Sequence, residues 1–294
     1  MSSISKNDPS ILVFDSGVGG LSIYQEVQRL VPSALYVYAS DNEAFPYGTK
    51  REEEVITRVS DVLHRLMSRF APDVLVVACN TASTVALPKI RSHIPIPVVG
   101  VVPAIKPAAR VSKSRVIGLL ATPGTVRRSY TRNLIDEFAH DCTVVRVGSS
   151  ELVELAEDKL RGKALDIEGI RRIIAPLFAD DYGSKLDTVV LGCTHFPLLK
   201  TELIAAAPWT VTWVDSGLAI AKRVMSLLKG KLTSSGPEEP YRYDRESFQQ
   251  AAFTRDGPDV SSLEPALRRL GFSSVVFIGG NPFVKMRVLE DPTP

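Results

Sequence analysis

Apolar and polar blocks alternate along this chain in a way that predicts strands and helices in turn. Short runs rich in Val, Ile and Leu are typical of buried strands in a parallel sheet. Residues 52–70 place Val55, Val59, Val62, Leu66 and Phe70 on one face, which predicts an amphipathic helix with an acidic start. The predicted strands lie at 11–14, 34–40, 73–78, 97–102, 115–121, 143–148, 187–192 and 210–215. The other predicted helices lie at 21–31, from about 80, and at 130–138, 150–178, 197–207 and 218–229.

The pattern restarts after Val102, which indicates two related units in tandem. The segment 115–126 resembles the opening segment 11–20, since each is a strand followed by a turn of glycine and small hydroxyl residues. The sequence therefore predicts an α/β fold of two pseudo-symmetric lobes with mainly parallel sheets and an active site in the cleft between them. We assign residues 1–102 plus 217–294 to the first lobe and residues 103–216 to the second.

The C-terminal part carries fewer signals. Residues 229–240 read as a polar linker rich in Gly, Pro and Ser. One more strand and helix are expected at 251–271, with Gly271 as the helix stop, and residues 274–280 read as a strand. The tail EDPTP (290–294) is expected to lack order.

Composition narrows the class of protein. The 294 residues carry 35 basic and 33 acidic side chains, a net charge of +2 that does not favour nucleic-acid binding. The polar first ten residues do not resemble a signal peptide, and no apolar stretch approaches the ~20 residues that span a bilayer. We therefore expect a cytoplasmic protein without membrane contact, in which the three cysteines are reduced thiols.

Two of these cysteines share one local setting. Cys79 lies in DVLVVACNTA (73–82) and Cys193 in DTVVLGCTHF (187–196). Each follows a buried strand, at the sheet edge where open α/β folds place their ligands. A predicted helix start follows each cysteine, and helix N-termini lower the pKa of a thiol and bind anions. A lone buried cysteine usually only packs, but the duplicated setting favours two equivalent chemical agents that face one substrate.

Further polar residues lie near the same predicted sheet edges. Asp15 begins the turn DSGVGG, Tyr47 lies in the turn 46–48 and could bring a phenol to the mouth of the site, and His195 exchanges protons near neutral pH. Thr122 and Thr125 occupy the equivalent edge of the second unit. Each of these residues also has a simpler interpretation. Asp15 would be a helix cap, Tyr47 a surface residue and His195 a structural residue, and Thr122 and Thr125 would be turn and cap residues. Cys142 reads as a small hydrophobe or an incidental thiol.

The motifs DSGVGG, DNEAFPYG, VVACNTAS, VVGVVPAIKPA, GLLATPGTV and VVLGCTHFPLL resemble the glutamate racemases of the aspartate/glutamate racemase superfamily. The likeness runs from about Ile11 to Gly271. It implies interconversion of L- and D-glutamate without pyridoxal phosphate, metal or other cofactor, in a pathway that supplies D-glutamate for peptidoglycan.

The resemblance also implies residue roles. Cys79 and Cys193 correspond to the two acid/base residues, and we expect Asp15 to assist Cys79 and His195 to assist Cys193. Glu157, in VELAE, matches a further acidic residue of the family. The substrate-contacting set is Asp15, Ser16, Tyr47, Gly48, Asn80, Thr81, Thr194 and His195.

The segment SDNEAFPYG resembles the enterobacterial branch, some of whose members require UDP-N-acetylmuramoyl-L-alanine as an activator. Glutamate is thus the expected substrate, this nucleotide a possible partner, and the protein a homodimer or a monomer.

Other functions remain open at this point. A relative that acts on aspartate, a hydantoin or a malonate shares the architecture, although the presence of both cysteines favours a racemase. A redox or regulatory protein would join Cys79 and Cys193 in a disulfide, which the lack of a close C-x-x-C pair disfavours. A ligand sensor on the same scaffold would bind without turnover.

Overall fold

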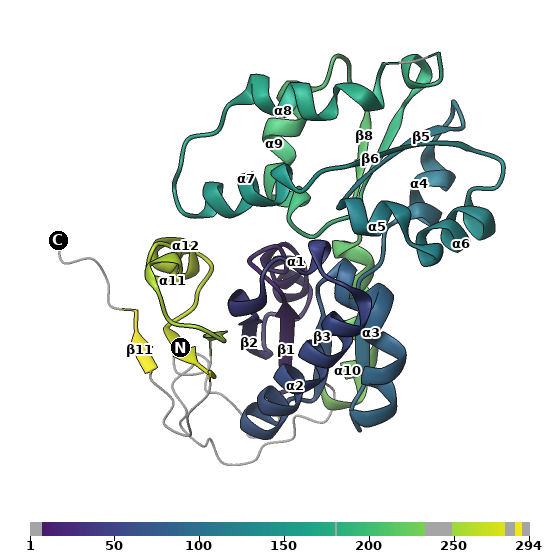
Figure 1. Cartoon of the computed structure of the whole chain (residues 1–294). Helices are drawn as coiled ribbons and strands as arrows, with labels where there is room; N and C mark the ends of the chain where they lie inside the picture. The colour runs from purple at the N-terminus through teal and green to yellow at the C-terminus, as the bar shows by residue number, and fades with distance from the viewer. Residues whose placement is uncertain (1–7, 180, 233–248, 280–285, 290–294) are drawn as a thin grey trace.

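The computed structural model describes residues 8–179, 181–232, 249–279 and 286–289, in which two lobes lie one above the other (Figure 1). The predicted tail and most of the predicted linker, from residue 233 on, lie outside the described residues. The first residues of that linker, 229–232, instead continue a helix.

The first lobe is built on a seven-stranded sheet in the order β11-β10-β9-β2-β1-β3-β4. Its strands are parallel except that β11 runs antiparallel to β10. The strands are β1 (Ser10–Asp15), β2 (Leu35–Ser40), β3 (Val74–Val77), β4 (Val98–Gly100), β9 (Gln250–Phe253), β10 (Ser274–Phe277) and β11 (Met286–Val288). The helices are α1 (Leu21–Leu30), α2 (Glu52–Phe70), α3 (Asn80–His93), α10 (Gly217–Leu232), α11 (Pro258–Ser261) and α12 (Glu264–Arg269).

Helices cover both faces of this sheet. Side chains of α1, α10 and α12 pack with Ile11 and Val13 on one face, and those of α2 and α3 pack with Leu12 and Phe14 on the other. This alternation follows from the strand period of two, and burial on both faces explains why β1 is apolar throughout. The amphipathic helix predicted at 52–70 is confirmed as α2.

The second lobe is built on a four-stranded parallel sheet in the order β6-β5-β7-β8. Its strands are β5 (Val116–Ala121), β6 (Thr143–Gly148), β7 (Thr188–Leu191) and β8 (Thr212–Val214). Its helices are α4 (Ile105–Val111), α5 (Pro123–Arg127), α6 (Ser129–Phe138), α7 (Glu151–Leu160), α8 (Ile167–Ile174) and α9 (Lys200–Ala206). Short 3₁₀ turns occur in both lobes. The first lobe contains η1 (Asn42–Ala44) and η2 (Tyr47–Thr49), and the second contains η3 (Ala175–Leu177), η4 (Gly183–Lys185) and η5 (Phe196–Leu199).

The continuous helix predicted at 150–178 is wrong in detail. The chain leaves α7 after Leu160 and passes through Gly162, which has a positive φ of 80°. It re-enters a helix only where the Asp166 side chain accepts the Glu168 N–H as a cap. A glycine in the left-handed region ends a helix because it lacks the Cβ that opposes that conformation.

The two lobes share one strand order, which confirms the predicted pseudo-symmetry. The run β2-β1-β3-β4 in the first sheet matches β6-β5-β7-β8 in the second, so β1 corresponds to β5 and β3 to β7. Ala78 donates to the Phe14 carbonyl after β3, and Gly192 donates to the Leu120 carbonyl after β7, each at 2.7 Å. The strands of each sheet fall within one of the two lobes that the sequence predicts. The exact lobe boundaries stay a prediction. Among the described helices, none has the length and apolar character that a bilayer crossing requires.

Candidate active site

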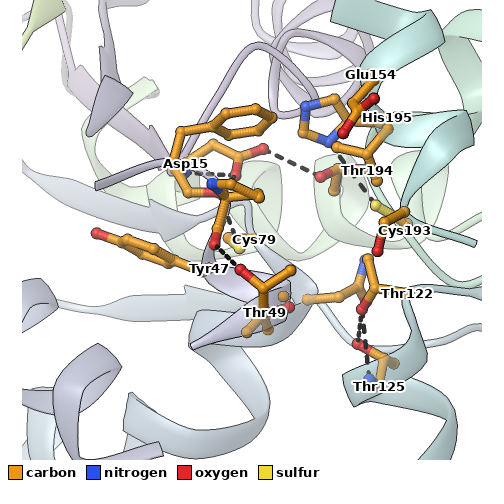
Figure 2. A pocket seen from close by; sticks show the side chains of 18 residues that line it. Asp15, Tyr47, Thr49, Cys79, Thr122, Thr125, Glu154, Cys193, Thr194 and His195 are labelled. Carbon is orange, nitrogen blue, oxygen red and sulfur yellow. Dashed lines mark hydrogen bonds between the residues drawn. The ribbon is translucent and has the colours of Figure 1, made fainter. Parts of the chain in front are cut away.

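A cavity of about 60 Å³ lies between the two lobes, and both repeated cysteines line it (Figure 2). Asp15, Ser16, Thr81 and Cys79 come from the first lobe, and Cys193, Thr194 and His195 from the second. The remaining lining residues are Phe45, Pro46, Tyr47, Gly48, Thr49, Asn80, Thr122, Thr125, Ser150, Val153 and Glu154. All residues predicted to contact a substrate therefore line one cavity, as do Thr122 and Thr125.

Topology explains why these residues meet. In each lobe the chain turns from one side of its first strand to the other, so the loops after β1 and β3, or after β5 and β7, leave a crevice between them. Ligands of open α/β sheets bind at this switch point. Asp15 ends β1 and Cys79 follows β3, while Thr122 follows β5 and Cys193 follows β7. The two crevices face each other across the cavity.

Asp15 connects Cys79 to the second lobe. The carboxylate is fully buried; its Oδ1 accepts from the Ser16 N–H at 2.6 Å, and its Oδ2 accepts from the Thr194 hydroxyl at 3.0 Å. The Ser16 hydroxyl lies 3.8 Å from the Cys79 sulfur. Burial raises the pKa of Asp15, although the His195 charge and its own hydrogen bonds, including one with Cys79, oppose that rise. The Ser16 hydroxyl contacts both groups, and the expected pairing of Asp15 with Cys79 stays a prediction.

Cys79 is the N-cap residue of α3, yet its predicted thiol activation is wrong in this structure. Burial first, and then the Asp15 charge, raise the pKa of Cys79 far above its usual value. A hydrogen bond with the Ala82 N–H, at the helix start, lowers the pKa but does not compensate. The charge of Cys193 adds to the rise. The neutral thiol form of Cys79 is therefore favoured.

Cys193 lies at one end of a chain of polar contacts. Its sulfur is 3.7 Å from His195 Nδ1, and His195 Nε2 is 2.9 Å from Glu157 Oε1. Burial disfavours a charged imidazole, but hydrogen bonds with Cys193 and Glu157 raise the pKa of His195 well above its usual value. Conversely, Glu157 has a lowered pKa because its bonds and charges with His195 and Arg161 outweigh its burial. The protonated form of His195 is therefore favoured, and its Nδ1 faces the Cys193 sulfur (Figure 2).

Glu157 also joins the lobes. Its Oε1 accepts from the Val18 N–H of the first lobe at 2.8 Å, and its Oε2 accepts from Arg161 at 2.7 Å. The turn DSGVGG approaches this network so closely that a Cβ at Gly17 would overlap Glu157 and one at Gly19 would overlap His195. Glu157, which the sequence matched to the family only through the short segment VELAE, thus holds His195 in place.

The setting of Cys193 differs from that of Cys79. Thr194 and His195 separate the cysteine from η5, and His195 is the residue before that 3₁₀ turn. Helix α9 begins only at Lys200. The predicted helix start directly after Cys193 is therefore wrong, and the nearby imidazole takes the place of helix N–H groups as the cationic partner.

Tyr47 lines the cavity, but its phenol does not reach into it. Figure 2 shows the ring extending away from the two sulfur atoms, and its hydroxyl donates to Asp41 Oδ2 at 2.6 Å. Asp41 also accepts from Arg58 and Thr254. The prediction of a phenol at the mouth is wrong because this buried carboxylate binds the hydroxyl. The turn 46–48 instead presents backbone and ring carbon to the cavity.

Asn80 lines the cavity. The residue is 5% exposed, and its Oδ1 is buried without a hydrogen-bond partner among the described residues. Thr122 and Thr125 keep their simpler role as well, because Thr122 Oγ1 accepts the Thr125 N–H as the cap of α5. Cys142 does not line the cavity, and all three cysteines are free thiols.

Sequence reasoning missed several lining residues. Ser150 and Glu154 follow β6 at the start of α7, a sheet edge that the strand pattern predicted but that carried no chemical motif. Phe45 and Thr49 flank the turn 46–48. In the described part of the chain, no cluster of three or more His, Cys, Asp or Glu side chains is arranged to hold a metal ion.

Comparison with known proteins places this geometry in a family context. A family model described as Asp/Glu/Hydantoin racemase matches residues 11–224. Glutamate racemases from Klebsiella pneumoniae and Pectobacterium carotovorum are each 48% identical over 267 residues, covering 91% of this chain and 91% and 90% of theirs.

Solved structures agree. The Escherichia coli glutamate racemase in complex with L-glutamate and the activator UDP-MurNAc-Ala is 46% identical, with a TM-score of 0.83, covering 91% of this chain and 97% of that one. A glutamate racemase isoform from Bacillus anthracis is 31% identical, with a TM-score of 0.73 over 90% of this chain and 94% of that one.

Proposed function

This chain belongs to the Asp/Glu/hydantoin racemase family, and we propose that it interconverts L- and D-glutamate by proton transfer between two cysteines. Its relatives are isomerases, and the chain is an enzyme of that class. The observation that carries the proposal is that Cys79 and Cys193, from different lobes, line one small cavity, to which Asp15 and His195 also contribute.

Racemisation removes the α-hydrogen from one face of the carbon and returns a proton to the other. Two bases on opposite faces achieve this without moving around the substrate. One sulfur acts as a thiolate base while the other, protonated, acts as the acid, and the roles exchange for the opposite enantiomer. In the resting state we assign the acid to Cys79, because burial and Asp15 raise its pKa. We assign the base to Cys193, because the His195 cation lies 3.7 Å from its sulfur.

Polar groups of the cavity would hold the substrate. The α-ammonium is the main hydrogen-bond donor of glutamate, and the unpaired Oδ1 of Asn80 is a buried acceptor beside Cys79. Hydroxyls of Ser16, Thr81 and Thr194 and the backbone at Tyr47 and Gly48 line the same space and suit the carboxylates. Donors fixed at the α-carboxylate would stabilise the charge that develops there as the proton leaves.

Isotope exchange tests the two-base scheme. With L-glutamate in D₂O, the D-glutamate formed should carry deuterium at the α-carbon, measured by mass spectrometry after chiral separation. Cys79→Ser and Cys193→Ser should each lower the racemisation rate by a factor of about 10³, because each removes an acid/base group. Cys142→Ser is the matched control and should keep the wild-type rate. Wild-type activity in Cys79→Ser would refute the scheme.

Substrate identity needs its own measurement. The same assay with aspartate, a hydantoin and a malonate separates glutamate racemisation from the alternative activities of related enzymes. We expect turnover with glutamate, since 46–48% identity to glutamate racemases extends over nine-tenths of the chain. Turnover confined to another member of this panel would contradict the proposal.

We extend the proposal to physiology on the same relatives. D-glutamate would enter peptidoglycan synthesis, in the cytoplasm, where the three free cysteines stay reduced. The E. coli relative binds the activator UDP-MurNAc-Ala. Addition of this nucleotide to the racemase assay should therefore raise the rate, and an unchanged rate would remove it as a partner.

A further inference from the structure

A positively charged groove lies directly outside the mouth of the cavity. Its volume is about 610 Å³, and its walls come from both lobes: residues 48–52 of the first, and α5 and the start of α6 of the second. Lys50, Arg127, Arg128 and Arg132 line it, with Glu52 as the single carboxylate among its lining residues. We call this surface, defined by these five side chains, the basic groove.

The basic groove and the cavity share part of their walls. Gly48, Thr49 and Ser150 line both spaces. The lobes meet here with almost no side chain between them, because a Cβ at Gly124 would lie 2.8 Å from the Gly48 carbonyl oxygen. The basic groove and the cavity therefore adjoin at this seam.

Arg128 has a buried Nη1 group without a hydrogen-bond acceptor among the described residues. Its side chain is only 9% exposed. Its Nε lies 3.3 Å from Glu52 across the lobe boundary. A buried guanidinium N–H without an acceptor is unfavourable, and a hydrogen bond to a carboxylate or phosphate oxygen would offset this cost.

The charges of the basic groove are largely uncompensated. Lys50 pairs with Glu54 and Arg128 with Glu52, but Arg127 and Arg132 have no ion-pair partner within the described ranges. The chain as a whole is nearly neutral, with 35 basic and 33 acidic residues, so this local excess is not a property of the average surface. Such a concave cationic surface concentrates anions near it.

We propose that the basic groove captures glutamate by its carboxylates and delivers it to the cavity. This inference rests on the proposed function. Glutamate at neutral pH carries two carboxylates and one ammonium group, and thus a net charge of −1. Arg127 and Arg132 provide the long-range attraction, and Arg128, which lines the groove at the seam between the lobes, adds its guanidinium charge there.

Charge variants test the capture step. Arg127→Gln/Arg132→Gln should lower kcat/KM for glutamate about fivefold at an ionic strength of about 10 mM through a higher KM, with kcat unchanged, because the groove acts before the chemistry. The difference should vanish near 0.5 M salt, where charges are screened within a few ångströms. Glu52→Gln, which makes the groove more positive, should raise kcat/KM at low salt.

The matched control is Lys222→Gln/Arg223→Gln, which removes two exposed charges from α10, outside the groove lining. It should keep the wild-type kcat/KM and its salt dependence. The capture role is wrong if the groove variants and this control behave alike, or if kcat falls instead of KM rising. A wild-type protein that racemises no glutamate would instead refute the proposed function, so the two failures are distinguishable.

Discussion

At the scale of single residues, the decisive feature is that two similar cysteines have different electrostatic surroundings. Asp15 brings a negative charge to Cys79, whereas His195 brings a positive one to Cys193. The two sulfur atoms therefore differ in the sign of the charge that faces them. Glu157 stabilises the surroundings of Cys193, because its contact with Nε2 orients His195 and favours the charged imidazole.

Glu157→Gln tests this relation. Loss of the anion should lower the pKa of His195, so the alkaline limb of the kcat/KM profile should move to lower pH. The exposed Glu151→Gln, on the same helix, is the control. A profile that coincides with that of the wild type would show that Glu157 does not set the charge of His195.

The same variant has a pH-dependent effect on stability. His195 has a raised folded pKa, so its contribution is full below its ordinary 6.5 and is lost as pH rises through the folded value. Glu157 has a lowered folded pKa, so its contribution is full above its ordinary 4.5 and is lost as pH falls. The free energy of unfolding should therefore drop by about 3 kcal/mol between these pH values and by less on either side, in urea titrations. A pH-independent loss would contradict the ion pair.

At the scale of elements, the segment between β2 and α2 depends on one buried carboxylate. Asp41 accepts from Tyr47 at the turn 46–48, from Arg58 on α2 and from Thr254 after β9. These three bonds fix the turn that forms one wall of the cavity. Burial opposes ionisation of Asp41, yet the bonds with Arg58, Tyr47 and Thr254 lower its pKa below the usual value.

Arg58→Met should therefore cost about 2 kcal/mol of unfolding free energy and raise KM, since the turn loses its anchor. Because the pKa of Asp41 is lowered in the folded state, this cost should be present above pH 3.8 and fade as pH falls further. Arg51→Met, at an exposed neighbouring position, is the control for loss of charge. An unchanged KM in Arg58→Met would show that the turn holds its shape without this contact.

At the scale of the whole molecule, function depends on how closely two similar lobes can meet. Thr194 of the second lobe donates to Asp15 of the first, and Val18 of the first donates to Glu157 of the second. Gly48 and Gly124 touch at the mouth, where any added side-chain atom would separate the lobes. The cavity is a product of this contact, since neither lobe encloses it alone.

Gly124→Ala should hold the lobes apart. Its Cβ would lie 2.8 Å from the Gly48 oxygen, against a backbone that cannot move aside like a flexible side chain. We expect kcat to fall about tenfold, because misplacement of reacting groups by a fraction of an ångström is costly, while the melting temperature changes little. Gly169→Ala, in α8, is the control, as its new Cβ meets only the side chain of Asp166. Wild-type kcat in Gly124→Ala would show that the seam need not close this tightly.

The sequence by itself determined the strand and helix order, the duplication and the two thiols, because burial periodicity and repeated motifs are local properties of the chain. Apolar runs such as 74–77 and 188–191 are typical of buried strands, and parallel strands bring Asp15 and Cys79 to one edge. The expected pairing of His195 with Cys193 rests on the resemblance to the glutamate racemases rather than on any pattern in the chain.

Only the tertiary structure decided the state of these groups. The pKa of Cys79 rises because burial and Asp15 outweigh the helix start, and the Tyr47 phenol turns from the cavity because Asp41 binds it. The links from Glu157 to Val18 and from Arg128 to Glu52 join residues more than seventy positions apart. Desolvation and contacts between lobes depend on the position of every packed element, and no local pattern in the chain encodes them.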